Sequence, residues 1–393
     1  MKKKRQKKEL KISFISLSAD YSAATSAVKH FINLHLDLFD KLHIVRERKS
    51  IRLINNQKIH YHELEKNKSQ NKYKDFINKI RFQIEISSEL INQNADIYYY
   101  HVGGSQLIIP TICLKFLRKK IAIIHTGIPG ICLNKFLNNY FLTKIFRLIE
   151  IIHFLIVDRN IFLAKSAIPW YFPNFLIQME KIAIANLNYI ENKLLETKLI
   201  DYRTFDLIYA GRSNKIEKYY KAYNLDKDIN TFNNTNFPFS KDNHKFHFIV
   251  LGTKNEVTFF EKLKNYLEIE ILYKDWQNPK TTQKYIMNSK LLILPSLSEG
   301  LPKVIIEAMK YGTIVLASPV GGITDLIKNG ENGFLIKKKK SLSALAQQIY
   351  EILSRDDLKK ISLNARETVK EKYNYNKIKK KYRKILESII PTK

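Results

Sequence analysis

The stretch SLSEGLPKVIIEAMKYG, residues 296–312, continues the wholly apolar run LLILP at 291–295. Such a run is typical of a strand that is buried on both faces of a parallel sheet. Pro302 suits the first position of a helix and Gly312 the left-handed residue just past its end, so we expect a helix at 302–311. The stretch therefore predicts a strand–turn–helix unit of a parallel α/β fold.

Two carboxylates, Glu299 and Glu307, lie on either side of this turn. Glu299 belongs to the loop at the carboxyl end of the strand, and Glu307 lies roughly 8 Å further along the helix axis. Open α/β sheets bind ligands at this edge, where a helix N-terminus offers N–H groups to an anion. A ligand with phosphate in its middle and hydroxyl groups at both ends would fit. The alternative is a solvated turn followed by a surface glutamate.

The composition favours a two-domain globular protein. The chain has 393 residues, more than one hydrophobic core usually organises, and its hydrophobic content of 45% excludes wholesale disorder. Its two cysteines, Cys113 and Cys132, cannot form a disulfide framework and indicate a reducing compartment. The net charge of +30 favours association with anionic surfaces without naming one.

Two segments raise the question of a membrane. The basic start followed by KISFISLS could pass for a signal peptide, but this apolar run is short and interrupted by serines, so we interpret it as a first buried strand. No run reaches the ~18 apolar residues of a membrane span. Residues 141–157 come closest, but Lys144, Arg147, Glu150 and His153 interrupt them as a stripe on a helix. This helix belongs either to the core or to a membrane interface.

Strand-like and helix-like segments alternate from end to end, which predicts parallel sheets with covering helices. We expect two doubly wound domains: residues 1–190 with a basic tail at 1–9, and residues 205–370. A linker at 191–204, within the polar stretch 186–204, separates them, and a C-terminal helix at 371–393 returns to the first domain. The expected strands are 11–17, 42–45, 96–100, 120–124, 160–164, 181–185, 205–210, 245–251, 268–272, 291–294, 313–317 and 333–336.

The second half carries enough matched residues to name a family. The stretch SEGLPKVIIEAMKYGTIVLASPVGGITDLIKNGENGFLI resembles the signature region of the family-4 (group 1) retaining glycosyltransferases with the GT-B fold. Their donor site contains a Glu, seven residues and a second Glu, the spacing of Glu299 and Glu307. The loop in IYAGRSNKIEK and the helical tail are similar as well. The resemblance implies two Rossmann-like domains that face one another across a cleft, with the acceptor on the first.

The resemblance also implies roles for single residues. Glu307 binds the ribose hydroxyls of a nucleoside-diphosphate sugar. Glu299 holds hydroxyls of the transferred sugar, and the amides of Gly300 and Leu301 lie near the sugar and phosphate. His125, which follows the strand at 120–124, occupies a position similar to that of the family's histidine near the reacting sugar. A loop histidine without a function is the alternative at that position.

The diphosphate would be held by the loop that contains Gly211 and Arg212, because a guanidinium makes paired charge-assisted bonds to phosphate oxygens. Lys218 fits the spacing of the family's partner lysine better than Lys215. The resemblance implies no metal and no cofactor besides the sugar nucleotide, which is a substrate. We interpret the Asp-Lys-Asp triplet at 226–228 as a solvated turn, and no His/Cys spacing indicates zinc.

The chain departs from the family in several loops. The segment SLSADYSAATS after the first strand has no glycine, the linker reads IANLNYIEN where Asn-Gly is usual, and Asp325 stands where the family has Glu after Gly321 and Gly322. These departures leave open whether the first domain keeps full activity.

The implied activity is that of a metal-independent hexosyltransferase. It moves a sugar with retention to a hydroxyl of a glycan or lipid-linked acceptor, in surface polysaccharide or glycolipid synthesis. We expect a cytoplasmic protein, peripheral at the inner face of the membrane if its basic surface and apolar helix contact lipid. A sugar-nucleotide epimerase on the same fold is one alternative, and a basic nucleic-acid-binding protein is another. No nucleic-acid-binding signature is present in the sequence.

Overall fold

The computed structural model describes most of the chain as two compact units. Unit 1 comprises Met1–Tyr189 and Tyr375–Lys393, and unit 2 comprises Ile190–Asn374. The described residues are 9–17, 21–47, 54, 56–65, 70–101, 107–125, 140–168, 180–190, 199–223, 225, 245–297, 299–337 and 341–390.

Unit 1 contains a seven-stranded parallel sheet in the order β3-β2-β1-β4-β5-β6-β7. Its strands are β1 (Lys11–Ser16), β2 (Lys41–Glu47), β3 (Ile59–Leu64), β4 (Ile97–Tyr100), β5 (Lys120–His125), β6 (Arg159–Phe162) and β7 (Ile182–Ile184). Each expected strand of the first half is present within a few residues of its predicted bounds. Strand β3, with the sequence IHYHEL, is not among the predictions.

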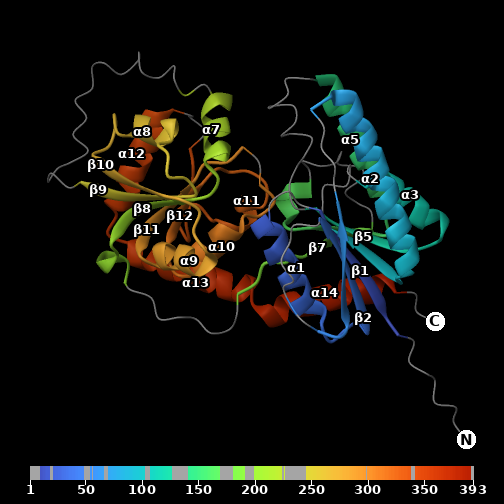
Figure 1. Ribbon diagram of the computed structural model, residues 1–393. Helices are drawn as coiled ribbons and strands as arrows, with labels where there is room; N and C mark the ends of the chain where they lie inside the picture. The colour runs from blue at the N-terminus through green and yellow to red at the C-terminus, as the bar shows by residue number, and fades with distance from the viewer. Residues whose placement is uncertain are drawn as a thin grey trace, which may run out of the picture. The chain divides into compact units, whose positions relative to one another are not determined.

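Helices cover both faces of this sheet (Figure 1). One face carries α1 (Tyr21–His35) and α14 (Tyr375–Ile389), and the other carries α2 (Lys72–Gln93), α3 (Ile108–Phe116) and α5 (Tyr140–Ile156). Alternate strand residues point to the two faces, so Tyr99 packs with α1 and α14 while Tyr98 and Tyr100 pack with α2 and α3. Helix α14 is fixed to α1 by a hydrogen bond of 2.9 Å from the Tyr375 hydroxyl to the Asn33 carbonyl.

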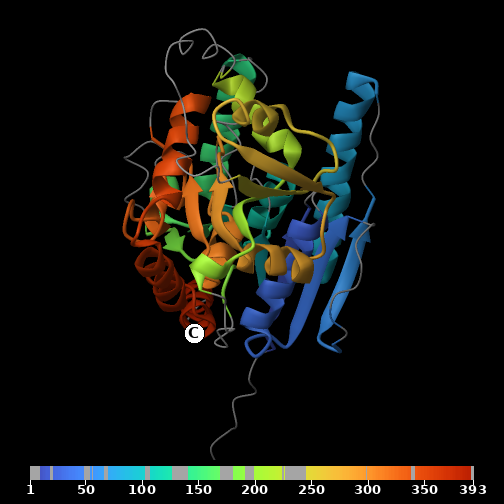
Figure 2. The ribbon, with the colours of Figure 1, turned by 90° about the vertical axis from the view of Figure 1, so that its left-hand side faces the viewer.

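Unit 2 repeats the plan with six parallel strands in the order β10-β9-β8-β11-β12-β13. These are β8 (Phe205–Ala210), β9 (Phe246–Leu251), β10 (Ile269–Lys274), β11 (Ser289–Leu294), β12 (Ile314–Ala317) and β13 (Phe334–Leu335). One helix layer contains α7 (Ser213–Ala222), α8 (Thr258–Leu263) and α12 (Leu342–Leu353). The other contains α9 (Pro279–Met287), α10 (Lys303–Lys310) and α13 (Leu358–Lys372) (Figures 1 and 2). The prediction of two Rossmann-like doubly wound domains is confirmed.

The bounds of unit 2 differ from the expected 205–370. Of the expected linker, the structure describes residues 199–204, which include a short 3-10 helix, Ile200–Tyr202, and the buried Arg203. The Arg203 guanidinium donates to the Ser289 carbonyl, the Thr313 hydroxyl and the Tyr311 carbonyl at 2.7–2.9 Å. At the other end, α13 continues to Lys372, and the unit ends at Asn374.

The helix of the opening stretch begins one residue later than predicted. Pro302 is the N-cap, with φ −66° and ψ 128°, and Lys303 is the first helical residue. An N-cap residue has extended backbone, which proline also adopts. Gly312 has φ +71°, the left-handed conformation expected just past the helix end.

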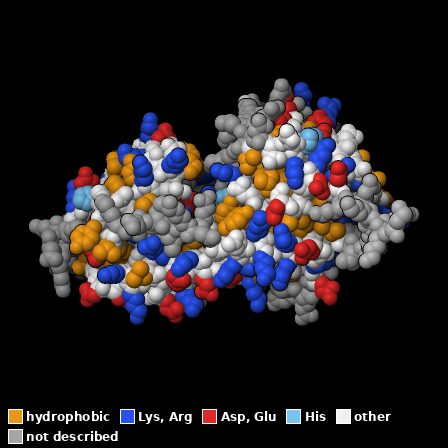
Figure 3. Space-filling model, turned by 90° about the horizontal axis from the view of Figure 1, so that it is seen from below, with side chains coloured by type: hydrophobic (Ala, Val, Ile, Leu, Met, Phe, Trp, Pro, Cys, Tyr) orange, Lys and Arg blue, Asp and Glu red, His pale blue; other side chains and the backbone are white. Residues whose placement is uncertain are grey.

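On the face seen in Figure 3, Lys and Arg side chains lie among acidic and hydrophobic ones. Within the described segments, no helix is long and apolar enough to cross a membrane.

Candidate functional site

The topology of unit 2 brings the loops after β8 and β11 together. The chain runs outward from β8 to β9 and β10, then returns to place β11 on the other side of β8. Two neighbouring strands whose connections leave in opposite directions form a topological switch point. Doubly wound sheets bind ligands there, at the carboxyl ends of the strands. Gly211 and Arg212 follow β8, and Glu299 follows β11, so the candidate residues flank this point.

The loop between β11 and α10 holds Glu299 in a defined position. The Ser296 hydroxyl donates to Glu299 Oε1 at 3.1 Å, and the Ser296 N–H donates to the Ser318 hydroxyl oxygen at 2.9 Å. Gly300 and Leu301 are buried while Glu299 is half-buried. The carboxylate is therefore oriented by its own loop and is accessible to a ligand.

Gly321, in the loop after β12, presses against this segment. It has φ +54°, and a Cβ atom at this position would lie 1.6 Å from the Glu299 carbonyl oxygen. The next residue, Gly322, donates its N–H to the Gly300 carbonyl at 2.6 Å. Only glycine fits such an approach, so this Gly-Gly pair supports the backbone that carries Glu299.

The loop after β8 is built on Tyr209, whose hydroxyl donates to the Arg212 carbonyl at 2.9 Å. A Cβ atom on Gly211 would lie 2.8 Å from this hydroxyl oxygen, so a larger residue does not fit there without a shift. The pKa of Tyr209 is raised, first by burial and second by the negative charge of Glu299. Glu299 therefore lies within electrostatic reach of the loop that carries Arg212.

Arg212 is the N-cap of α7, and its side chain is exposed. Lys218, on the same helix, is exposed as well. The side chain of Lys215 and residues 226–228, which include the Asp-Lys-Asp triplet, lie outside the described part of the chain.

Glu307 lies on the second turn of α10, half-buried. Its Oε1 atom is 3.4 Å from the ammonium of Lys303, the first residue of the helix. The carboxylate contributes to a raised pKa of Tyr311, after the larger effect of burial. The first N–H groups of an α-helix have no partner within the helix, so the start of α10 can hold an anion between the two carboxylates.

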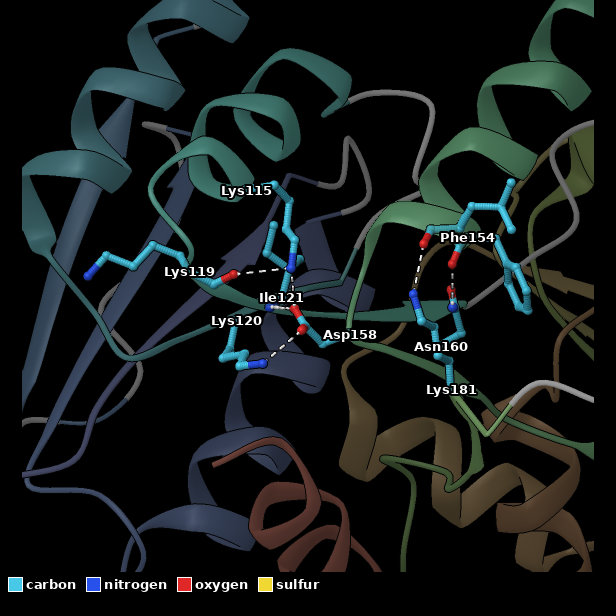
Figure 4. A network of polar contacts seen from close by, with 9 residues as sticks. Lys115, Lys119, Lys120, Ile121, Phe154, Asp158, Asn160 and Lys181 are labelled. Carbon is cyan, nitrogen blue, oxygen red and sulfur yellow. Dashed lines mark hydrogen bonds and ion pairs between the residues drawn. The ribbon is translucent and has the colours of Figure 1, made fainter. Parts of the chain in front are cut away.

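His125 lies in unit 1, at the carboxyl end of β5, and is buried. Its Nε2 atom lies 2.9 Å from Asn160 Oδ1, and its ring stacks on Phe162 with ring centres 4.5 Å apart. Asn160 is itself held by the Phe154 carbonyl, which accepts from its Nδ2 atom at 3.1 Å (Figure 4). Burial lowers the pKa of His125 to about 4, against a smaller opposing effect of the bond to Asn160. The imidazole is therefore neutral at pH 7.

A separate polar network in the same view ties unit 1 together at the opposite edge of the sheet (Figure 4). Asp158 accepts from the ammonium groups of Lys115 and Lys120, at 2.9 and 3.1 Å, and from the Ile121 N–H at 2.9 Å. These contacts join α3, the start of β5 and the start of β6. Because ligands bind at the carboxyl edge, we assign this network to structure.

The supporting residues Tyr209, Ser296 and Ser318 are not among the sequence predictions. The contact between Ser296 and Ser318 joins two loops that are 22 residues apart in sequence, and only Ser296 lies in the opening stretch. Among the residues that the structure describes, no group of three or more His, Cys, Asp or Glu side chains has the arrangement of a metal site.

Part of unit 2 matches the model of a known protein family. Residues 211–372 match the family model described as glycosyl transferases group 1. An uncharacterized glycosyltransferase of Methanocaldococcus jannaschii is 28% identical over 191 residues, which span 47% of this chain and 45% of that protein. WcaL of Salmonella typhimurium, whose name assigns it provisionally to colanic acid biosynthesis, is 28% identical over 110 residues. These residues span 26% of this chain and 27% of WcaL. The match thus covers less than half of each relative.

The resemblance of fold extends to the whole chain. The crystal structure of Anabaena HepE in complex with UDP-glucose superposes on this chain with a TM-score of 0.64 and 14% sequence identity. The superposition covers 96% of this chain and 100% of the HepE chain. At this level of identity the likeness concerns the fold alone. Residues 211–372 therefore match the group 1 glycosyltransferases, in a chain whose two units have the parallel α/β architecture of GT-B glycosyltransferases.

Proposed function

We propose that the protein transfers a sugar, with retention, from a nucleoside-diphosphate sugar to a hydroxyl of a glycan or lipid-linked acceptor. The observation that carries this proposal is the placement of Glu299, Glu307 and the start of α10 at the switch point, beside the loop of Gly211 and Arg212. This arrangement offers a cation and helix N–H groups to a diphosphate, and one carboxylate to the hydroxyl groups on each side of it.

In this proposal each residue has a separate task. Arg212 binds the diphosphate together with Lys218 or Lys215. Glu307 accepts hydrogen bonds from the ribose hydroxyls, and Glu299 accepts them from the transferred sugar. The amides of Gly300 and Leu301 lie near the sugar and phosphate. No divalent metal takes part, because the basic side chains and the helix N-terminus stabilise the departing diphosphate.

The chemical step would depend on positioning. Retention through a covalent intermediate requires a carboxylate nucleophile close to the anomeric carbon. Glu299 is instead assigned to the sugar hydroxyls, so we propose a reaction on one face, in which the departing phosphate helps to deprotonate the acceptor hydroxyl. His125, neutral at pH 7 and held by Asn160, would then act as a hydrogen-bonding partner near the sugar and not as a cation.

The comparisons support the class of reaction. HepE was crystallised with UDP-glucose, and the name of WcaL points to a surface polysaccharide. A bacterial-type surface polysaccharide or glycolipid is accordingly the acceptor class that we propose here. The epimerase and nucleic-acid-binding alternatives find no support among these relatives.

A screen of nucleoside-diphosphate sugars for thermal stabilisation tests the proposal, followed by hydrolysis or transfer assays with the best binder. A ligand at 100 times its dissociation constant should stabilise the fold by about 2.7 kcal/mol. The Arg212→Gln variant should lose most of this stabilisation. The proposal fails if no uridine, guanosine or adenosine diphosphate raises the melting temperature. If duplex DNA raises it instead, the hypothesis of a nucleic-acid-binding protein replaces the proposal.

A further inference from the structure

Asn160 is a buried amide on β6, in the interior of the unit 1 sheet. It lies in register with Ile123 of β5, and its side chain points to the face of the sheet that α5 covers. Ile121 and Ile123 occupy neighbouring positions on this face. A third apolar residue at position 160 would pack there without any polar atom to satisfy. The amide therefore indicates a task beyond packing.

Two hydrogen bonds fix the direction of the Asn160 amide. Its Nδ2 atom donates to the Phe154 carbonyl of α5 at 3.1 Å (Figure 4). A carbonyl oxygen only accepts, so the amide nitrogen must face it, and a reversed amide would set two oxygen atoms against each other. Oδ1 is thereby turned towards Nε2 of His125, which lies 2.9 Å away.

This direction determines which nitrogen of His125 carries the proton. An amide oxygen only accepts, so Nε2 is the donor of this bond. Burial lowers the pKa of His125 to about 4, and a neutral imidazole has one N–H group, so Nδ1 keeps its lone pair. His153 on α5 adds no charge at pH 7, because burial lowers its pKa to about 4 as well. The ring also stacks on Phe162, with 8° between the planes, which restricts its rotation.

We propose that Asn160 is a positioning residue that holds His125 as the Nε2–H tautomer, so that the ring acts through Nδ1 as a hydrogen-bond acceptor. The consequence for catalysis rests on the proposed function. A sugar hydroxyl can donate to Nδ1 of this tautomer, whereas Nδ1 of the opposite tautomer could only donate to the sugar. A ring that is fixed before the sugar binds needs no reorganisation during the reaction.

Nitrogen NMR spectra of protein labelled at histidine read the tautomer directly, and His125→Gln assigns the signals. Wild type should carry the proton on Nε2 at pH 7. Asn160→Leu removes the acceptor, so the preference for Nε2 should be lost. Turnover should then fall about two- to tenfold, the usual worth of one hydrogen bond.

Asn160→Asp separates positioning from packing. Its carboxylate still accepts from Nε2, so the tautomer should persist and turnover should stay closer to wild type than in Asn160→Leu. The negative charge should raise the pKa of His125, so turnover should be lost at a higher pH than in wild type as Nδ1 becomes protonated.

Gln93→Leu is the matched control for the loss of a buried amide. Gln93 lies in the same unit, accepts from the Ser13 hydroxyl at 2.8 Å and donates to Glu89 Oε1 at 3.0 Å. Its replacement should lower the melting temperature, as Asn160→Leu does, and leave the His125 tautomer and the turnover unchanged.

The outcomes separate this inference from the proposed function. A proton on Nδ1 in wild type overturns the inference. An unchanged tautomer and turnover in Asn160→Leu would also overturn it, while the donor site would stand. Equal losses of turnover in Asn160→Leu and Gln93→Leu would assign the effect to stability instead of positioning. If Asn160→Leu does not fold, the spectra and pH profiles of wild type and Asn160→Asp decide. If wild type turns over no sugar nucleotide, the proposed function fails, and the spectra alone decide the tautomer.

Discussion

At the scale of single residues, the candidate site depends on glycines that permit close backbone approach. Gly321 and Gly330 both have positive φ values, +54° and +83°, but only Gly321 faces another backbone. A Cβ atom on Gly330 would meet nothing within 4 Å. A substitution at Gly330 therefore causes only the conformational strain of a left-handed residue, whereas a substitution at Gly321 also removes the support of the Glu299 backbone.

Gly321→Ala should lower both stability and donor binding, whereas Gly330→Ala should lower stability alone. A left-handed alanine costs roughly 1–2 kcal/mol at either position. At position 321 the methyl group would in addition displace the Glu299 carbonyl, and with it the carboxylate. Melting temperatures and donor affinities of the two variants check this. Equal donor affinity in both variants would contradict the supporting role of the Gly-Gly pair.

The ion pair between Lys303 and Glu307 leads to a second expectation at this scale. Lys303→Met should raise the Michaelis constant for the donor up to about fivefold at unchanged turnover, because exposed pairs are worth about 0.2–1 kcal/mol and orient the carboxylate. Lys303→Arg should preserve the value. Lys328→Met breaks a pair of the same 3.4 Å length, with Glu331, and serves as the control. A lower Michaelis constant in Lys303→Met would mean that the lysine competes with the ribose.

At the scale of elements, α5 differs from the simple amphipathic helix that its sequence suggests. Glu150 and His153, two members of the polar stripe, are buried, while Leu148, Ile152 and Leu155 are exposed at 58%, 37% and 43%. Its neighbour α3 exposes two further apolar residues, Ile112 and Phe116, and the C-cap residue Leu117 is exposed as well. This exposed apolar surface favours the membrane-interface hypothesis for α5 over a purely internal helix.

If α5 contacts lipid, Leu148→Gln combined with Leu155→Gln should reduce co-sedimentation with anionic vesicles severalfold. The reason is that each exposed leucine would bury its side chain among the lipid chains, which is worth up to about 1.5–3 kcal/mol. High salt should weaken binding of the parent protein by screening its basic groups. Leu363→Gln, at a 54% exposed position of α13, is the control. Equal recovery in the supernatant with neutral and anionic vesicles would leave α5 without a membrane role.

The elements also show what could be predicted from the sequence. Strand β11, helix α10 and the left-handed Gly312 follow from an apolar run and from helix-end signals that are local in sequence. Strand β3 was missed because its histidines and tyrosine replace an apolar run. The role of Arg203 was missed for another reason, since its three acceptors belong to segments 86 to 110 residues away. Ser318 supports the site through a contact with Ser296, which lies 22 residues away in the sequence.

At the scale of the whole molecule, unit 1 holds a set of buried histidines that should make the protein acid-sensitive. Burial lowers the pKa to about 4 for His35, His43, His125 and His153. An unfolded histidine has a pKa near 6.5. Between these values the unfolded chain binds more protons than the folded one, so stability is present above pH 6.5 and is lost as the pH falls towards 4.

The free energy of unfolding should fall between pH 7 and pH 5 by at most about 1.4 kcal/mol per pH unit for each buried histidine. Urea titrations at several pH values measure this slope. His35→Phe should reduce the slope by about one proton, because His35 is fully buried. Stability that is constant from pH 7 to pH 5 would contradict the neutral, buried state of these side chains.

The central claim is that Glu299 and Glu307 form the donor site with different tasks, and steady-state kinetics of Glu299→Gln and Glu307→Gln tests it most directly. Glu307→Gln should raise the Michaelis constant for the donor at nearly unchanged turnover, because a ribose contact is equal in ground and transition states. Glu299→Gln should lower turnover about ten- to a hundredfold, since it removes a charge-assisted bond to the reacting sugar. Neither enzyme should need added divalent metal. Near-normal affinity and turnover in both variants would contradict the claim.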